Sequence, residues 1–151
     1  MLGSTPMLPM LDKAIAERAN LSPETFVTVF GAGWELAPAQ AGDSPSEWFV
    51  VGEPAQLMLT IDGLGDIIVA RPRGVWNGVA GLTFVPEDQT GLGMGWAFDR
   101  DGARQQVRTL LTSRRRSFRY CPSCLGLTPP ELMDGRERCM GCAQTLFGTV
   151  Y

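Results

Sequence analysis

Two short stretches near the end of the chain, Cys121-Pro122-Ser123-Cys124 and Cys139-Met140-Gly141-Cys142, decide how its C-terminal part folds. They hold all 4 cysteines of the 151-residue sequence, and fourteen residues separate them. Two C-x-x-C pairs at this separation are typical of a tetrahedral site in which four thiolates bind one ion. Asp134-Gly135 favours a turn between the pairs, which would bring the second pair opposite the first. The spacing therefore predicts one structural Zn²⁺ ion bound by Cys121, Cys124, Cys139 and Cys142.

Two other interpretations of the cysteines stay open. Rubredoxin-like iron also binds paired C-x-x-C motifs, although their usual C-x-x-C-G form does not occur here. A C-x-x-C dithiol can be redox-active, but such dithiols begin a helix beside a βαβ pattern, which this sequence does not show. If zinc is bound by four thiolates, it has no open position for water, so we expect a structural metal. Residues 119–151 are too few and too polar to fold around their own apolar core, so the metal would stabilise them.

Residues 119–151 resemble the zinc-ribbon superfamily, and within it the ribbon of NADH pyrophosphatases of the Nudix class. In that ribbon a short helix leads through basic and aromatic residues into the first cysteine pair, as Leu110-Leu111 leads through Arg114 to Tyr120 here. An aromatic residue and a strand follow the second pair there, as residues 147–151 follow it here. The resemblance implies only the four metal ligands, because the catalytic Nudix box that follows the ribbon in that family is not matched in these 151 residues.

The composition excludes several catalytic mechanisms. The sequence has no histidine, so it cannot form a Ser-His or Cys-His nucleophile or an HExxH metal site. Lys13 is the only lysine, and no phosphate-binding loop surrounds it. We therefore expect no enzymatic activity.

No segment approaches the 18 or more apolar residues that a membrane span needs. The first residues lack the basic start of a signal peptide. These features predict a cytoplasmic protein that is not in a membrane, in a reducing compartment where free thiols or metal ligands are expected.

The charge is distributed unevenly along the chain. Residues 1–98 carry eleven acidic and four basic side chains, whereas residues 99–151 carry five acidic side chains and nine arginines. Such asymmetry predicts a polyanionic partner for the basic part, either nucleic acid or an acidic protein surface. Arginine and aromatic side chains suit phosphate and base contacts, and an equally open alternative is a solvated helix face followed by a charged hinge. The candidate binding strip comprises Arg104, Arg108, Arg114, Arg115, Arg116, Phe118, Arg119 and Tyr120.

The first part of the chain predicts a helical hairpin at about residues 9–31. Ser22 suits the N-cap of the second helix, Pro23 its first position, and Gly31 its end. Residues 14–30 are similar to the helix-turn-helix of LacI-type repressors, which would make the second helix a DNA-reading one. That helix has no basic side chain to meet phosphates, so a packed helical hairpin is favoured.

The middle of the chain predicts a small antiparallel sheet at about residues 48–98, including strands at 82–85 and 94–98 and a tight type I′ hairpin at Asn77-Gly78. A long helix at about residues 102–116 follows, with an inward stripe formed by Ala103, Val107, Leu110 and Leu111. The whole sequence thus predicts an α+β protein, with an α+β domain over residues 1–118 and a C-terminal Cys₄ zinc ribbon over residues 119–151.

These features predict a non-enzymatic zinc-binding protein with a macromolecular partner, for which nucleic acid or its processing machinery is favoured. One alternative is a structural subunit of a larger assembly, such as a phage particle or a multiprotein complex. Another is a degenerate Nudix-type relative that retains only the ribbon.

Overall fold

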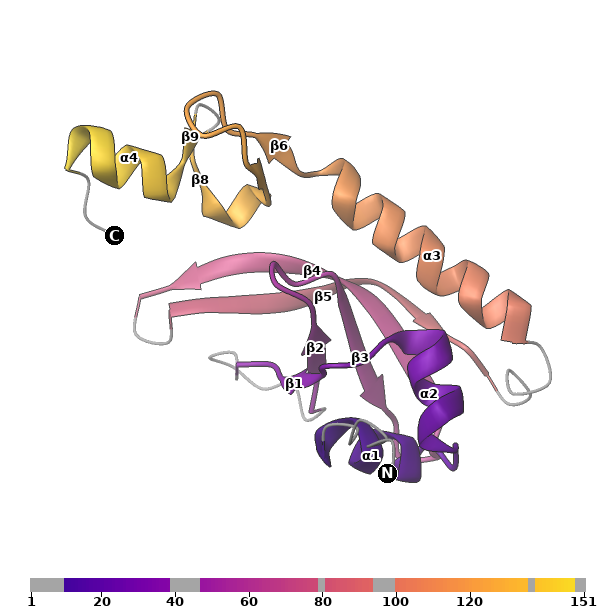
Figure 1. Ribbon diagram of the computed structural model, residues 1–151. Helices are drawn as coiled ribbons and strands as arrows, with labels where there is room; N and C mark the ends of the chain where they lie inside the picture. Colours follow the sequence, from indigo (N-terminus) through magenta and orange to yellow (C-terminus); the bar gives the residue numbers. More distant parts are fainter. Residues whose placement is uncertain (1–9, 39–46, 79–80, 94–99, 136–137, 149–151) are drawn as a thin grey trace, which may run out of the picture.

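The computed structural model describes residues 10–38, 47–78, 81–93, 100–135 and 138–148. A five-stranded antiparallel sheet forms its centre, three helices pack against one face of that sheet, and a small cysteine-containing unit follows the third helix (Figure 1). The α+β class expected from the sequence is therefore confirmed.

Helices α1 (Met10–Arg18) and α2 (Pro23–Phe30) occupy the region predicted to be helical. Ser22 caps α2, because its hydroxyl accepts a hydrogen bond from the Thr25 amide at 3.2 Å. Helix α2 packs between α1 and α3. Its Phe26 and Phe30 side chains are buried, so its apolar face belongs to the core rather than to a DNA groove.

The sheet consists of β1 (Glu35–Leu36), β2 (Phe49–Val51), β3 (Leu57–Ile61), β4 (Ile67–Asn77) and β5 (Gly81–Gly91), in that spatial order. Every neighbouring pair is antiparallel, as the lack of crossover helices between the strands predicts. The predicted strand at residues 82–85 lies within the longer β5. The predicted strand at residues 94–98 lies outside the described residues.

The turn between β4 and β5 differs from the predicted one. Asn77 is the last residue of β4 and pairs with Gly81, so residues 78–80 form the connection and Asn77 is not a central turn residue. Gly81 has the left-handed backbone conformation, with a φ of 76°. The prediction of a two-residue type I′ turn at Asn77-Gly78 is therefore wrong, because the strand pairing continues one residue further than the dipeptide rule implies.

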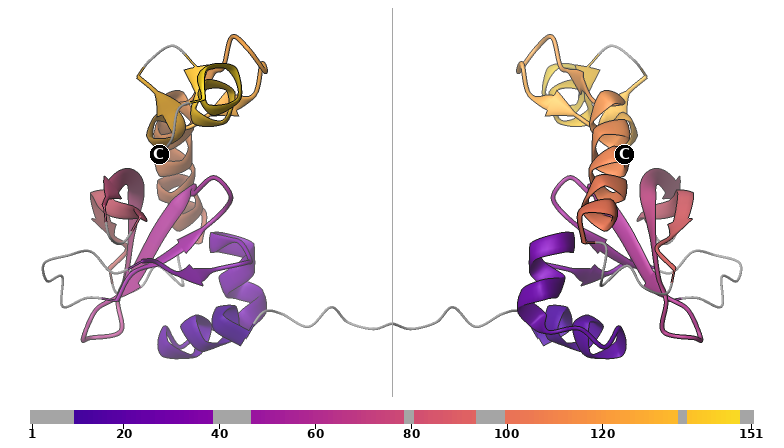
Figure 2. Two further views of the ribbon diagram at one scale, coloured as in Figure 1. Left: turned by 90° about the vertical axis from the view of Figure 1, so that its left-hand side faces the viewer. Right: turned by 90° about the vertical axis from the view of Figure 1, so that its right-hand side faces the viewer.

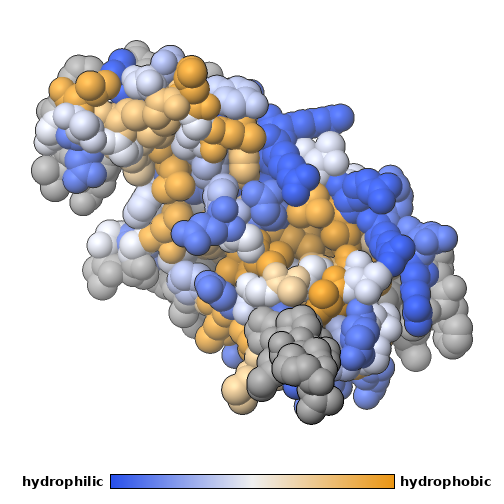
Figure 3. Space-filling model, in the orientation of Figure 1, coloured by the Kyte–Doolittle hydropathy of each residue, from blue (hydrophilic) through white to orange (hydrophobic). Residues whose placement is uncertain are grey.

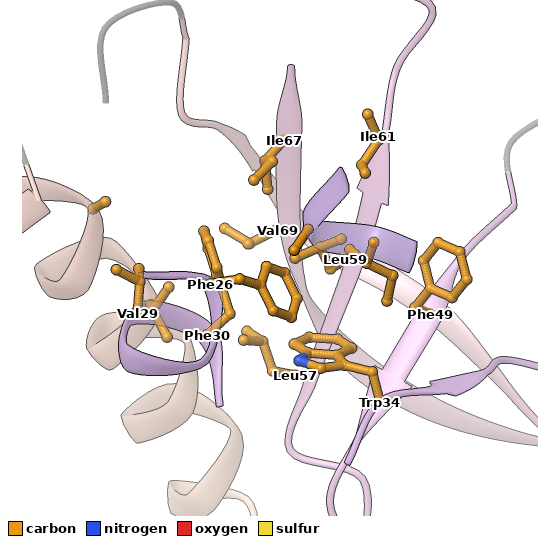
Figure 4. Packing of buried hydrophobic residues seen from close by; sticks show 14 of the residues in the cluster. Phe26, Val29, Phe30, Trp34, Phe49, Leu57, Leu59, Ile61, Ile67 and Val69 are labelled. Carbon is orange, nitrogen blue, oxygen red and sulfur yellow. The ribbon is translucent and has the colours of Figure 1, made fainter. Parts of the chain in front are cut away.

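The main core lies between the helices and one face of the sheet (Figure 4). Phe49, Leu59 and Val69 share that face because they are paired across β2, β3 and β4. The Phe26 ring packs against Trp34, with the ring centroids 6.1 Å apart. A smaller cluster on the opposite face of the sheet contains Val50, Ala55, Met58 and Ala70. Apolar side chains on both faces of the sheet are therefore buried.

Helix α3 (Arg100–Arg116) matches the predicted long helix and packs on β3, β4 and α2. Ala103, Val107 and Leu110 face the core, as their spacing predicts. Arg114 follows Leu110 by four residues, so it continues the same buried stripe.

Residues 119–148, which we call the cysteine module, follow α3 directly and lie at the end of the molecule away from α1 and α2 (Figures 1 and 2). The module contains two short hairpins and ends in a helix; its elements are β6 (Arg119–Tyr120), β7 (Leu127–Thr128), a 3₁₀ turn η1 (Pro130–Leu132), β8 (Met133–Asp134), β9 (Arg138–Cys139) and α4 (Met140–Phe147). Gly135, with φ of 62°, follows β8, so the turn predicted at Asp134-Gly135 is present.

The second cysteine pair lies at the start of helix α4, which ends at Phe147 and is followed by Gly148 in the left-handed conformation. Of the strand expected at residues 147–151, residues 149–151 lie outside the described residues. The physical reason for the helix is local, because Cys139 caps the helix N-terminus and the following residues include good helix formers such as Met140 and Ala143. The predicted zinc-ribbon fold is not confirmed, whereas the closeness of the cysteines does not depend on it.

The β4–β5 hairpin contacts the cysteine module at the η1 turn. The Trp76 indole N–H donates a hydrogen bond to the Glu131 carbonyl oxygen at 2.7 Å. The Glu131 side chain lies directly over Gly74, where a Cβ atom would come within 2.7 Å of the Glu131 Cδ atom. Gly74 therefore allows the module to approach the hairpin.

Substituting Gly74 with alanine is expected to lower the free energy of unfolding by about 1–3 kcal/mol, because the new methyl group must displace the buried Glu131 side chain. Denaturant unfolding measures this change. Gly78→Ala is the matched control, since nothing lies within 4 Å of a Cβ atom at that position. Equal effects of the two substitutions would contradict the close approach.

Candidate metal centre

The four cysteines come from two places in the module. Cys121 and Cys124 lie on the turn that joins β6 to β7, and Cys139 ends β9 while Cys142 lies in the first turn of α4. The β8–β9 hairpin brings the second pair back to the first. Their four sulfur atoms all lie within 4.8 Å of one another. The sequence prediction that these residues converge is confirmed.

The spacing of the sulfur atoms fits a tetrahedral metal ion. Zinc–sulfur bonds of about 2.3 Å at tetrahedral angles require sulfur atoms about 3.8 Å apart. The Cys124 and Cys139 sulfur atoms are 3.9 Å apart, and all four cysteines are free rather than disulfide-bonded. The cluster can therefore bind one metal ion, and its donor set is compatible with zinc.

Backbone amides point at the sulfur atoms and hold them in place. The Cys139 amide donates to the Cys121 sulfur, the Gly126 amide to the Cys124 sulfur and the Cys142 amide to the Cys139 sulfur, each at 3.4 Å. Leu125 makes the first turn possible by adopting a φ of 62°, and its amide donates to the Cys121 carbonyl at 2.7 Å. These N–H groups stabilise negative charge on the sulfurs.

The surroundings shift the pKa values of two of the cysteines in opposite directions. The hydrogen bond from the Cys139 backbone amide is the largest cause that lowers the pKa of Cys121 to about 6. The hydrogen bond with the Cys139 side chain is the largest cause that raises the pKa of Cys142 to about 12. Four thiolates in so small a volume repel one another, and a divalent cation among them removes that repulsion.

The four cysteines differ in their exposure to solvent. Cys121 is buried and Cys124 is exposed, so the cluster lies near the surface of the module. Within the described residues, the cysteines are the only group of three or more metal-ligating side chains of this kind. A metal bound by all four sulfur atoms would have no open position for substrate.

Some residues of the predicted arginine strip are exposed and others are buried. Arg104, Arg108, Arg115, Arg116, Arg119 and Tyr120 are exposed, and Arg119 donates hydrogen bonds to the carbonyl oxygens of Arg116 and Phe118 at 2.9 Å each. Arg119 thus stabilises the C-terminal end of α3, where free carbonyl groups carry partial negative charge.

The inclusion of Arg114 and Phe118 in that exposed strip is wrong. Only 2% of the Arg114 surface and 7% of the Phe118 surface is exposed. The Arg114 guanidinium lies 4.9 Å from the centre of the Phe118 ring. The physical reason is a carboxylate that sequence reasoning did not pair with Arg114, that of Glu131.

Arg114 and Glu131 form a buried joint between α3, the sheet and the cysteine module. Both guanidinium NH₂ groups of Arg114 bond the Glu131 carboxylate, one of them at 3.1 Å. The Arg114 Nε atom donates to the Ala55 carbonyl at 2.9 Å. The helical spacing from Leu110 to Arg114 was the available signal for this inward position. No signal in the sequence indicated that Glu131, seventeen residues further along the chain, would be its partner.

Comparison with models of known protein families, with curated proteins and with solved structures finds no match. The fold and site by themselves define an α+β protein that carries a four-cysteine cluster after its third helix. None of the helices in the described part of the chain is long and apolar enough to cross a membrane.

Proposed function

We propose that this chain is a non-enzymatic zinc-binding protein that binds a macromolecular partner, with nucleic acid or its processing machinery favoured. The convergence of four cysteine sulfur atoms within 4.8 Å supports the zinc site. Zinc is favoured over rubredoxin-like iron because neither cysteine pair has the usual C-x-x-C-G form. It is favoured over a redox dithiol because four sulfur atoms converge rather than two. When bound, the ion would supply structure rather than chemistry.

The six exposed residues of the strip support the choice of partner. The exposed arginines lie on α3 and directly after it, beside the module whose folding we assign to zinc. Guanidinium groups match phosphate geometry, and exposed arginines at this density favour a polyanion. The module would hold the strip in position, since Arg119 and Tyr120 belong to its first strand.

Fluorescence anisotropy of the zinc-loaded full chain with labelled DNA and RNA at low salt tests this function. We expect binding that weakens steeply as salt rises, because phosphate contacts release counterions. If no nucleic acid binds at low salt, the alternative of a structural subunit in a larger assembly is favoured. Zinc-dependent hydrolysis of NADH that one carboxylate substitution abolishes would contradict the non-enzymatic assignment.

A further inference from the structure

The exposed arginines of α3 are arranged in a row. Successive α-helical residues are about 100° apart, so residues four apart differ by only about 40° and residues eleven apart by about 20°. Arg100, Arg104 and Arg108 follow each other at intervals of four, and Arg115 lies eleven residues after Arg104. The row is about 22 Å long at 1.5 Å per residue. Arg116, about 120° from Arg104, lies outside the row.

The row carries positive charge that no carboxylate of the described residues pairs with. All four arginines are exposed, and no ion pair connects them to another residue in the described ranges. Arg115 donates instead to the neutral Gln56 amide oxygen at 3.2 Å. By contrast, Arg71 and Arg73 on β4 pair with carboxylates of β5. Like charges four residues apart destabilise a helix, so an external anion along this row would relieve a repulsion.

The spacing fits the backbone of a duplex. The first three arginines rise along the helix by about 6 Å each. Each strand of a duplex carries a phosphate about every 3.4 Å of its axis, so phosphates are spaced more closely than the arginines and each long arginine side chain can reach one. Figure 3 shows several hydrophilic patches along α3, with hydrophobic surface beside them.

Single strands fit this surface less well. Proteins that hold single strands add aromatic side chains on which the bases stack. Two aromatic residues are predicted beside the arginines. Phe118 is buried against Arg114, whereas Tyr120 is 70% exposed. The surface therefore offers several charges but, of the aromatic residues predicted beside them, only Tyr120 for stacking.

We infer that the row of Arg100, Arg104, Arg108 and Arg115 binds the phosphate backbone of double-stranded nucleic acid. This inference rests on the proposed function and specifies its partner. Electrostatic attraction by the row supplies the affinity, so duplexes of unrelated sequence bind alike.

The test measures binding of the zinc-loaded full chain to a 20-base-pair duplex and to one of its strands over a salt series. We expect tighter binding of the duplex. Arg104→Gln and Arg108→Gln should each reduce the magnitude of the slope of log K against log salt by about 0.9. Arg73→Gln is the control, with the same charge change on β4, where Arg73 pairs with Glu87 outside the strip, and it should leave the slope unchanged. Thermal unfolding of Arg104→Gln and Arg108→Gln should match that of the wild-type chain.

Three results would overturn the inference while leaving the proposed function in place. They are tighter binding of the single strand, an unchanged slope for both Arg104→Gln and Arg108→Gln, and an equal change of slope for Arg73→Gln. Absence of binding to every nucleic acid would instead contradict the proposed function, and this inference with it.

Discussion

Replacing any one of Cys121, Cys124, Cys139 and Cys142 with serine is expected to unfold the cysteine module while the sheet and helices α1 to α3 stay folded. The two hydrophobic clusters of the described residues contain no side chain from the module. We therefore expect its folding to depend on the metal, whose binding free energy is on the order of 10 kcal/mol in small zinc modules. Losing one thiolate removes most of that free energy.

Elemental analysis of the purified chain and hydrogen exchange of the module check this expectation. The wild-type chain should contain one zinc ion, and a chelator should reproduce the effect of each cysteine substitution. Ser123→Ala is the control, because Ser123 lies between two of the ligands and is exposed. Iron in place of zinc, or a protected module with no metal and reduced thiols, would contradict the zinc assignment.

The second large effect is expected at the buried joint. Glu131→Gln or Arg114→Met should each lower the free energy of unfolding by about 3–5 kcal/mol, because each leaves an uncompensated charge or broken network in the interior. Only 2% of either side chain is exposed, so water cannot replace the lost partner. The Arg114 substitution also removes the hydrogen bond to the Ala55 carbonyl.

A double-mutant cycle in denaturant measures the coupling between the two side chains. Arg114→Met combined with Glu131→Met should cost less than the two single substitutions together, since apolar side chains carry no charge to desolvate. Arg73→Gln is the control, because Arg73 pairs with Glu87 while 54% of its side chain is exposed. Such pairs contribute about 0–1 kcal/mol. A single substitution at the joint that costs no more than this control would show that the joint does not stabilise the fold.

Local signals in the sequence determined most of the secondary structure. The cap at Ser22, the inward stripe from Ala103 to Leu110 and the spacing of the two C-x-x-C pairs each involve residues that are close along the chain. The physical rules that govern them, capping, helical periodicity and ligand spacing, need no knowledge of distant residues. Helix α4 could have been predicted in the same way from its helix-forming residues and Gly148.

Only the tertiary structure decided which charged and aromatic residues of the strip are on the surface. An arginine is normally exposed, and Arg114 is buried because the Glu131 carboxylate, the Ala55 carbonyl and the Phe118 ring surround it. Glu131 in turn reaches that place because Gly74 leaves room for it. Burial of a charge depends on partners brought together by folding, whereas the cysteine pairs converge through one short hairpin. The metal ligands could therefore be identified from sequence, and the extent of the exposed arginine surface could not.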